Sequence, residues 1–185
     1  WQSKNCFLSY SKALIYLLLR DSFVGYLTKK KKQSGKSPNV YYNKRKANGK
    51  SNYLSGKFYS EKNKRFVTYR SSYELRFFHL LEKRSDVISY EVESIEIPYK
   101  DLDGNYRKYI PDALVLLANG DIKICEIKPE AMLDNVIVKR KAQACKYHFK
   151  KIFNDSDISC EYLFITEKEL FSSPSDYSAF IKQHS

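Results

Sequence analysis

The most informative pattern in the chain lies between Tyr109 and Lys128, where two apolar, strand-like runs are separated by Asn119 and Gly120. An Asn-Gly pair between two such runs is typical of a β-hairpin. Each run also carries charge: Asp112 stands at the head of the first, and Glu126 and Lys128 end the second. Ionised groups beside a core are costly unless they are paired or bind a metal. The hairpin therefore carries the candidate chemistry.

Apolar residues recur with helical or strand-like spacing on both sides of this hairpin. The predicted elements are, in order, a helix from Ser71 to about Lys83, a strand near Val92–Tyr99 closed by Pro98, the hairpin, a helix of about Asn135–Phe153, a strand at 161–166, a helical turn at 167–171 and a last helix opened by Ser173 and Pro174. This α-β-β-β-α-β order predicts an α/β fold. A strand reached through a helical crossover runs parallel to its neighbour, so the last strand should pair in parallel with one strand of the hairpin.

The first part of the chain has a different texture. Residues 1–64 contain one helical candidate, Ser11–Leu19, and then a stretch rich in Lys, Arg, Asn, Gly, Ser and Tyr without a sustained apolar period. We expect a loop, an extended arm or partial disorder in that stretch, and a compact domain over 65–185. The apolar run Ala13–Leu19 is far too short to span a membrane, so no membrane association is expected.

Charge changes the picture further. The chain has 33 Lys and Arg against 21 Asp and Glu, a formal net charge of +12, which favours a polyanionic partner such as DNA. In the basic stretch, tyrosines alternate with cations, which suits base stacking and phosphate contact, although a solvated linker explains the same composition. The candidate DNA-binding residues are Lys29, Lys30, Lys31, Lys32, Lys44, Arg45, Lys46, Lys139 and Lys141.

The four cysteines form no CxxC pair and have no histidine at zinc-site spacing. Cys125 falls within an apolar strand, and Cys145 falls on one helix face. Buried free thiols in a reducing compartment are the simpler interpretation. This fits a cytoplasmic protein.

The length of the hairpin loop decides whether the two carboxylates share a face. A two-residue Asn-Gly loop would place Asp112 and Glu126 on opposite faces of the hairpin, because side chains alternate along a strand. A three-residue loop, 118–120 with Gly120 in a left-handed bulge, pairs Leu117 with Asp121 and sets Asp112 opposite Glu126. Lys128 then shares their face. We predict the three-residue loop.

With both acids on one face, their oxygens can hold a hard divalent cation such as Mg²⁺, helped by the backbone carbonyl of Ile127 and by waters. Such a cation polarises a phosphoryl group and lowers the pKa of bound water. Lys128 can position or deprotonate that water, or neutralise charge on the pentavalent phosphate. The alternative interpretation is an ordinary carboxylate–lysine ion pair at a strand end.

Glu74 is a candidate third acid, because it lies on a helix among the apolar residues Phe77, Phe78 and Leu81. Ser71-x-x-Glu74 is also the pattern of a capping box, in which Glu74 bonds back to the amide of Ser71. The two roles are compatible.

Together these motifs resemble the PD-(D/E)xK nuclease superfamily. Glu74, Pro111-Asp112 and Glu126-Ile-Lys128 occur in the order of that superfamily's motif, and no residue departs from it. Within the superfamily, segments between about Tyr69 and Leu170 resemble the TnsA-type transposon endonucleases and the head-completion nucleases of phages. The resemblance implies a restriction-endonuclease-like core, a mixed central sheet flanked by helices.

The resemblance also implies a function: a Mg²⁺-dependent DNA endonuclease, with Mn²⁺ as a substitute metal, that leaves 5′-phosphate and 3′-hydroxyl ends. Glu74, Asp112 and Glu126 would be the acidic metal-site residues and Lys128 the catalytic lysine. Transposase subunits, or phage portal and capsid proteins, are the implied protein partners, and the host cytoplasm or a virion is the implied location. A competing hypothesis is a structural head-completion or DNA-binding protein that keeps the nuclease fold without turnover.

Overall fold

The computed structural model describes residues 54–154 and 157–184, and a compact unit begins at Ser55. The predicted helix Ser11–Leu19, the thiol of Cys6 and the basic residues from Lys29 to Lys46 lie outside the described residues.

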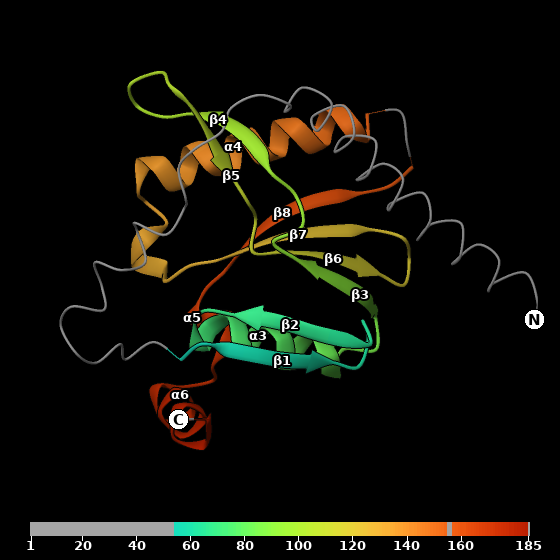
Figure 1. Ribbon diagram of the computed structural model, residues 1–185, viewed down its shortest axis with the longest axis vertical. Coiled ribbons are helices and arrows are strands. Elements are labelled where there is room, and N and C mark those ends of the chain that lie inside the picture. The colour runs from blue at the N-terminus through green and yellow to red at the C-terminus, as the bar shows by residue number, and fades with distance from the viewer. Residues whose placement is uncertain (1–53, 155–156, 185) are drawn as a thin grey trace, which may run out of the picture. The chain divides into compact units, whose positions relative to one another are not determined.

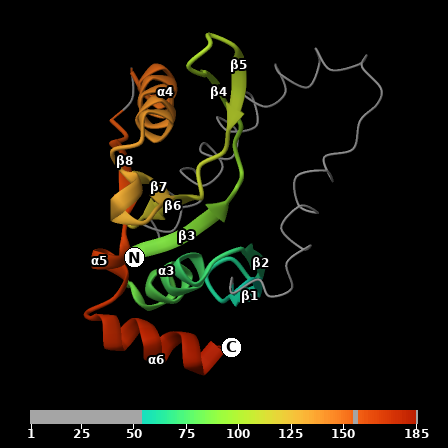
Figure 2. The ribbon, with the colours of Figure 1, turned by 90° about the vertical axis from the view of Figure 1, so that its left-hand side faces the viewer.

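A four-stranded sheet forms the centre of this unit. Its strands are ordered β3 (Val87–Val92), β6 (Ala113–Leu117), β7 (Ile122–Ile127) and β8 (Cys160–Ile165). The first three are antiparallel neighbours, whereas β8 runs parallel to β7 as the helical crossover predicted. Figure 2 shows α3 (Ser72–Lys83) and α4 (Val136–Ile152) on opposite sides of the sheet. The predicted α/β class, a mixed central sheet flanked by helices, is confirmed.

Both predicted long helices form, and local chemistry sets where each begins. The Ser71 hydroxyl caps α3 by accepting a hydrogen bond from the Glu74 amide. The Asn135 side chain caps α4. The buried face of α4 consists of Val138, Ala142, Cys145 and Phe149, at helical spacing, and this face packs the helix onto the sheet.

Two further strands, β1 (Gly56–Ser60) and β2 (Arg65–Tyr69), pair as a hairpin beside α3, as Figure 1 shows. The loop predicted as far as Lys64 is therefore wrong for residues 56–60. The predicted arm also ended at 64, whereas the compact unit begins at Ser55. The strand was missed because its five residues, Gly-Lys-Phe-Tyr-Ser, have too little apolar character to register as a strand.

The strand predicted near Val92–Tyr99 is confirmed only at its ends, because residues 93–96 form no strand and Val92 and Ile97–Tyr99 belong to different strands, β3 (Val87–Val92) and β4 (Ile97–Lys100). The chain leaves β3 after Val92, because Glu93 takes a left-handed conformation with φ 49°. It then forms a separate two-stranded sheet of β4 (Ile97–Lys100) and β5 (Tyr106–Tyr109) that lies beside α4 (Figure 1). Pro98 lies within β4 and does not end it. An edge strand tolerates a proline because its outer N–H is not needed for pairing.

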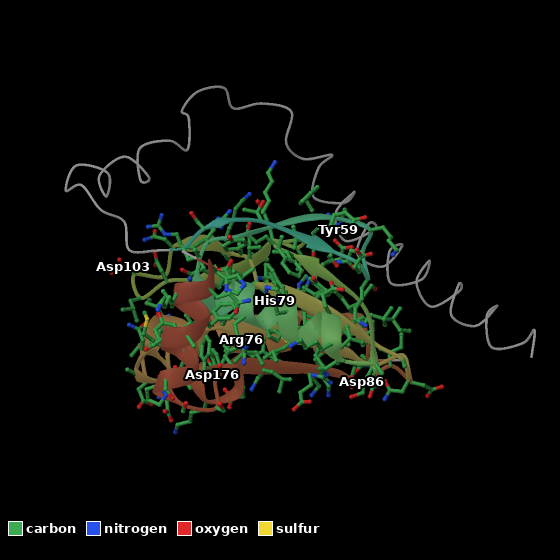
Figure 3. The ribbon with its side chains drawn as sticks, turned by 90° about the horizontal axis from the view of Figure 1, so that it is seen from below. Tyr59, Arg76, His79, Asp86, Asp103 and Asp176 are labelled. Carbon is green, nitrogen blue, oxygen red and sulfur yellow. The ribbon has the colours of Figure 1, made fainter. Side chains whose placement is uncertain are left out.

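The C-terminal part contains a 3₁₀ turn at Glu130–Met132, α5 (Glu167–Leu170) and α6 (Pro174–His184). As predicted, Ser173 caps the last helix, accepting from the Asp176 amide at 3.1 Å. Figure 3 shows Arg76 and His79 of α3 on the side near Asp176, and the Arg76 guanidinium lies 3.1 Å from the Asp176 carboxylate. This pair ties α6 to α3.

Two other expectations concern burial. Cys125 and Cys145 are buried free thiols, as predicted, and Cys160 is a half-buried free thiol. No helix in the part of the chain that the structure describes is long and apolar enough to cross a membrane.

The hairpin between β6 and β7 has the predicted three-residue loop. Leu116 pairs with Ile122, and the Leu117 amide donates to the Asp121 carbonyl at 2.9 Å. Gly120 has the predicted left-handed backbone, with φ 91°. This register carries Asp112 to the position opposite Glu126.

Replacing Gly120 with alanine should destabilise the protein by about 1–2 kcal/mol, because an L-residue is strained at positive φ. A Cβ at Gly120 would meet no heavy atom within 4 Å, so the loss reports backbone strain and not crowding. Urea unfolding of the variant measures this loss. A variant as stable as the wild type would contradict the left-handed bulge.

Candidate active site

Backbone pairing brings the head of β6 and the tail of β7 together. Ala113 pairs with Cys125, and one residue further along the same register Asp112 stands opposite Glu126. The Asp112 carbonyl accepts from the Glu93 amide at 3.3 Å, so the end of β3 supports the same point. Beyond β7, the Lys128 amide donates to the Ile165 carbonyl of β8 at 3.0 Å. The candidate residues therefore stand on paired backbone.

The Lys128 ammonium lies between the two carboxylates. Its Nζ is 2.9 Å from Oε1 of Glu126 and 3.6 Å from Oδ2 of Asp112, and it also donates to the Ile127 carbonyl at 3.1 Å. Oδ2 of Asp112 accepts from the Ile127 amide at 2.7 Å, which fixes this carboxylate across the strand pair. Glu126 is nearly buried, whereas Asp112 and Lys128 are partly exposed. Solvent and ligands can thus reach the site from the side of Asp112 and Lys128.

The charges of the site are unequal. Burial, and then the negative charge of Glu126, raise the pKa of Asp112 to about 7, against the opposing effect of Lys128. Burial acts to lower the pKa of Lys128, but the charges of Asp112 and Glu126 outweigh it and raise that pKa. One ammonium thus faces two carboxylates. When all three groups are ionised the cluster carries excess negative charge, which favours binding of a further cation.

Glu74 acts mainly on its own helix end. Its carboxylate accepts from the Arg70 amide at 2.9 Å and contacts the Ser71 hydroxyl at 3.1 Å. The predicted bond to the Ser71 amide is therefore wrong by one residue. The charge of Glu74 nevertheless raises the pKa values of Asp112 and Lys128. Glu74 stands near the site but contributes no contact to it.

Two tyrosines that the sequence analysis assigned no role complete the surroundings of Glu126. The Tyr109 hydroxyl, at the end of β5, donates to Oε2 of Glu126 at 2.6 Å. The hydroxyl of Tyr162 on β8 lies 2.9 Å from that of Tyr109. No local signal in the sequence marks this contact, because Tyr109 ends the polar strand Tyr-Arg-Lys-Tyr and its partners are distant along the chain.

Of the candidate DNA-binding residues, two lie in the described part. Lys139 forms an exposed ion pair with Asp134 at 2.8 Å. Lys141 instead lies over the rings of Tyr99 and Tyr109, with its Nζ at 5.8 and 5.6 Å from the ring centroids. Lys141 therefore lies next to Tyr109, which contacts Glu126. DNA binding by Lys139 or Lys141 stays a prediction.

The donor set can be compared with what a divalent cation requires. Carboxylate and carbonyl oxygens are suitable ligands for Mg²⁺, and Asp112, Glu126 and the Ile127 carbonyl supply them. Within residues 54–154 and 157–184, no group of three or more His, Cys, Asp and Glu side chains is arranged to hold a metal ion. The oxygens that fit such a cation are thus those of Asp112, Glu126 and the Ile127 carbonyl, with water for the remaining positions, and a metal role for Glu74 stays a prediction.

Replacing Asp112 with asparagine should stabilise the metal-free protein at pH 8, by of order 2 kcal/mol. The folded-state pKa of Asp112 is raised above its ordinary value of 3.8, so the folded state binds the proton more tightly than the unfolded state. The cost of ionising Asp112 then grows as the pH rises from about 4 to about 7 and levels off above that range. Urea unfolding in EDTA between pH 5 and pH 8 measures the difference.

Asp86 provides the control, because its exposed carboxylate is paired with Arg84 and has a lowered pKa. Its replacement with asparagine should give no gain at pH 8. An Asp112→Asn variant that loses stability at pH 8 would contradict the electrostatic description of the site.

Comparison with known proteins finds a match over the part of the chain that holds this arrangement. Residues 84–163 match the family model described as "TnsA-like endonuclease N terminal". The matched region contains Asp112, Glu126 and Lys128, together with Tyr109 and Tyr162, but not Glu74. The resemblance to TnsA-type endonucleases is confirmed over this region.

A particular relative is the head completion nuclease of Enterobacteria phage T4. The two sequences are 35% identical over 65 residues, which cover 35% of this chain and 43% of the phage protein. The chain therefore matches less than half the length of this relative. Both predicted resemblances are confirmed, over a stretch narrower than the predicted Tyr69–Leu170.

Proposed function

We propose that this chain is a divalent-cation-dependent DNA endonuclease. The observation that carries the proposal is the convergence of Asp112, Glu126 and Lys128 at one end of the β6–β7 hairpin. The match of this region to TnsA-like endonucleases, the similarity to a phage nuclease and the net charge of +12 support it.

Asp112 and Glu126 would hold the cation, with the Ile127 carbonyl and waters as further ligands. Mg²⁺ is the proposed cation and Mn²⁺ its substitute; when bound, such an ion polarises the phosphoryl group and lowers the pKa of a coordinated water. The scissile phosphate would sit on the more exposed side of the site, beside Asp112 and Lys128. The proposed products carry 5′-phosphate and 3′-hydroxyl ends.

Lys128 has three candidate roles, and its electrostatics favour one of them. Because the two carboxylates raise its pKa, Lys128 stays an ammonium while they are uncompensated, which makes it a poor acceptor of a proton. An ammonium suits neutralisation of the charge that develops on the phosphate in the transition state. Glu74 would act through its charge or through a bridging water, since its oxygens are engaged at the start of α3.

Cleavage of a supercoiled plasmid tests the proposal. Wild-type protein should nick or linearise the plasmid with Mg²⁺ or Mn²⁺ and should fail to do so in EDTA, and Asp112→Ala and Lys128→Ala variants should be inactive. Equal nicking by the wild type and both variants would attribute the activity to a contaminant and overturn the proposal.

A second candidate, a DNA-binding or structural head-completion protein without turnover, is favoured by one observation. The Lys128 ammonium pairs with both carboxylates, at 2.9 and 3.6 Å, so the arrangement can persist without a cation. This function predicts salt-sensitive DNA binding that survives Asp112→Asn, with no cleavage in any divalent cation. We also propose transposase subunits, or phage portal and capsid proteins, as protein partners. The proposed location is a host cytoplasm or a virion.

A further inference from the structure

Glu126 has more defined surroundings than the other charged residues of the site. Its side chain is 5% exposed, and each of its oxygens has a separate partner. Oε1 faces the Lys128 ammonium at 2.9 Å, and Oε2 accepts from the Tyr109 hydroxyl at 2.6 Å. The two oxygens of this carboxylate are therefore not equivalent.

The direction of the hydrogen bonds follows from the chemistry of the groups. An ionised carboxylate can only accept, so Tyr109 must donate its single proton to Glu126. The Tyr109 oxygen is then free to accept, and the proton in its 2.9 Å contact with Tyr162 comes from Tyr162. Both phenol groups keep their protons at neutral pH, since an ordinary tyrosine ionises only near about pH 10. The result is a donor chain from Tyr162 through Tyr109 to Oε2.

The packing makes this chain rigid. Tyr109 is 2% exposed and Tyr162 is 9% exposed, and they belong to β5 and β8 while Glu126 belongs to β7. Glu126 is thus held by Tyr109 of β5, which Tyr162 of β8 supports in turn, and its Oε2 cannot turn without breaking a buried hydrogen bond. Such a bond to a charged group is strong, and its loss is costly in a site shielded from water.

We infer that Tyr109 and Tyr162 are positioning residues that confine Glu126 to binding the cation through Oε1 alone, and that they thereby favour small octahedral cations over larger ones. The inference rests on the proposed function. Mg²⁺ and Mn²⁺ suit single-oxygen carboxylate ligands, whereas Ca²⁺ readily takes both oxygens of one carboxylate and tolerates irregular geometry. Releasing Oε2 removes the restriction that disfavours Ca²⁺.

Titration calorimetry without DNA, with Mn²⁺ and with Ca²⁺ separately, tests the inference. Tyr109→Phe should weaken Mn²⁺ binding by about 10-fold, in the range found when a group that supports a metal ligand is removed. Its Ca²⁺ affinity should fall by less than about 3-fold or should increase, so the ratio of Mn²⁺ affinity to Ca²⁺ affinity falls. Tyr162→Phe should shift the ratio in the same direction by a smaller factor, because it acts on Glu126 through Tyr109.

Tyr99→Phe is the matched control. Tyr99 also lies under Lys141, but the structure gives it no hydrogen bond to Glu126, so its variant should keep the wild-type ratio. If Tyr109→Phe lowers the affinity for both cations equally, the substitution has only damaged the structure. If it lowers neither affinity, Tyr109 does not restrain Oε2. Either result overturns the inference. If Tyr109→Phe does not fold, an unchanged ratio in Tyr162→Phe overturns it.

The outcomes also separate this inference from the proposed function. A wild type that cleaves DNA with Mg²⁺, together with a Tyr109→Phe variant of unchanged cation ratio, sinks the inference alone. A wild type that neither binds Mn²⁺ nor cleaves DNA sinks both.

Discussion

Replacing Lys128 with methionine is expected to lower DNA cleavage by at least about 100-fold, the effect of removing a positioned charge from a reacting centre. Methionine keeps the length of the side chain but takes the ammonium away from Asp112 and Glu126, which it contacts at 3.6 and 2.9 Å. Because the carboxylates remain, Mn²⁺ binding measured by calorimetry should be kept or become tighter. Single-turnover cleavage at saturating Mn²⁺ gives the loss in rate.

Lys123 is the control for this experiment. It lies on β7, the strand that ends just before Lys128, and its ammonium pairs with Glu161, away from the candidate site. A Lys123→Met variant should cleave within about 2-fold of the wild type, since surface ion pairs contribute little. If the Lys128→Met variant retained cleavage, Lys128 would have no part in the reaction. Its contacts with Asp112 and Glu126 would then be an ordinary ion pair at a strand end.

Replacing Phe78 with alanine should cost about 3–5 kcal/mol of unfolding free energy, the largest effect on stability expected here. Phe78 is fully buried on α3, and its ring stacks on that of Tyr90 in β3 with centroids 5.6 Å apart. The cavity left by its ring lies where the helix meets the sheet. Urea unfolding at constant pH gives the difference.

Phe66→Ala separates this effect from the loss of any phenyl group. Phe66 is 64% exposed and touches Tyr59, with ring centroids 5.2 Å apart, on the β1–β2 hairpin. Its removal should cost less than about 1 kcal/mol. Similar losses for both variants would contradict the packing of α3 on the sheet.

The sequence was sufficient for the hairpin because the information there is local. Gly120 tolerates the left-handed bulge, the apolar runs fix which faces are buried, and the two together determine which residue opposes Asp112. The buried face of α4 was predictable for the same reason, since its residues repeat at helical spacing. The parallel pairing of β8 followed from the helical crossover that connects it to β7.

The misses have a common physical origin. The bond from Tyr109 to Glu126 joins residues 17 apart, and its continuation to Tyr162 spans 53 residues, so neither leaves a local pattern. The left-handed turn at Glu93, which separates β3 from β4, falls on a residue type with little preference for that conformation. Such features depend on tertiary contacts and become visible only in the assembled fold.

Reversible dependence of cleavage on a divalent cation is the most direct test of the central claim, that Asp112, Glu126 and Lys128 form one cation-dependent nuclease site. The rate of plasmid cleavage should be measured in one preparation with Mg²⁺, then with excess EDTA, and again after Mg²⁺ is restored, for the wild type and Asp112→Asn in parallel. We expect activity to disappear and return in the wild type and to be absent throughout in the variant. Cleavage that persists in EDTA, or that Asp112→Asn retains, would contradict the claim.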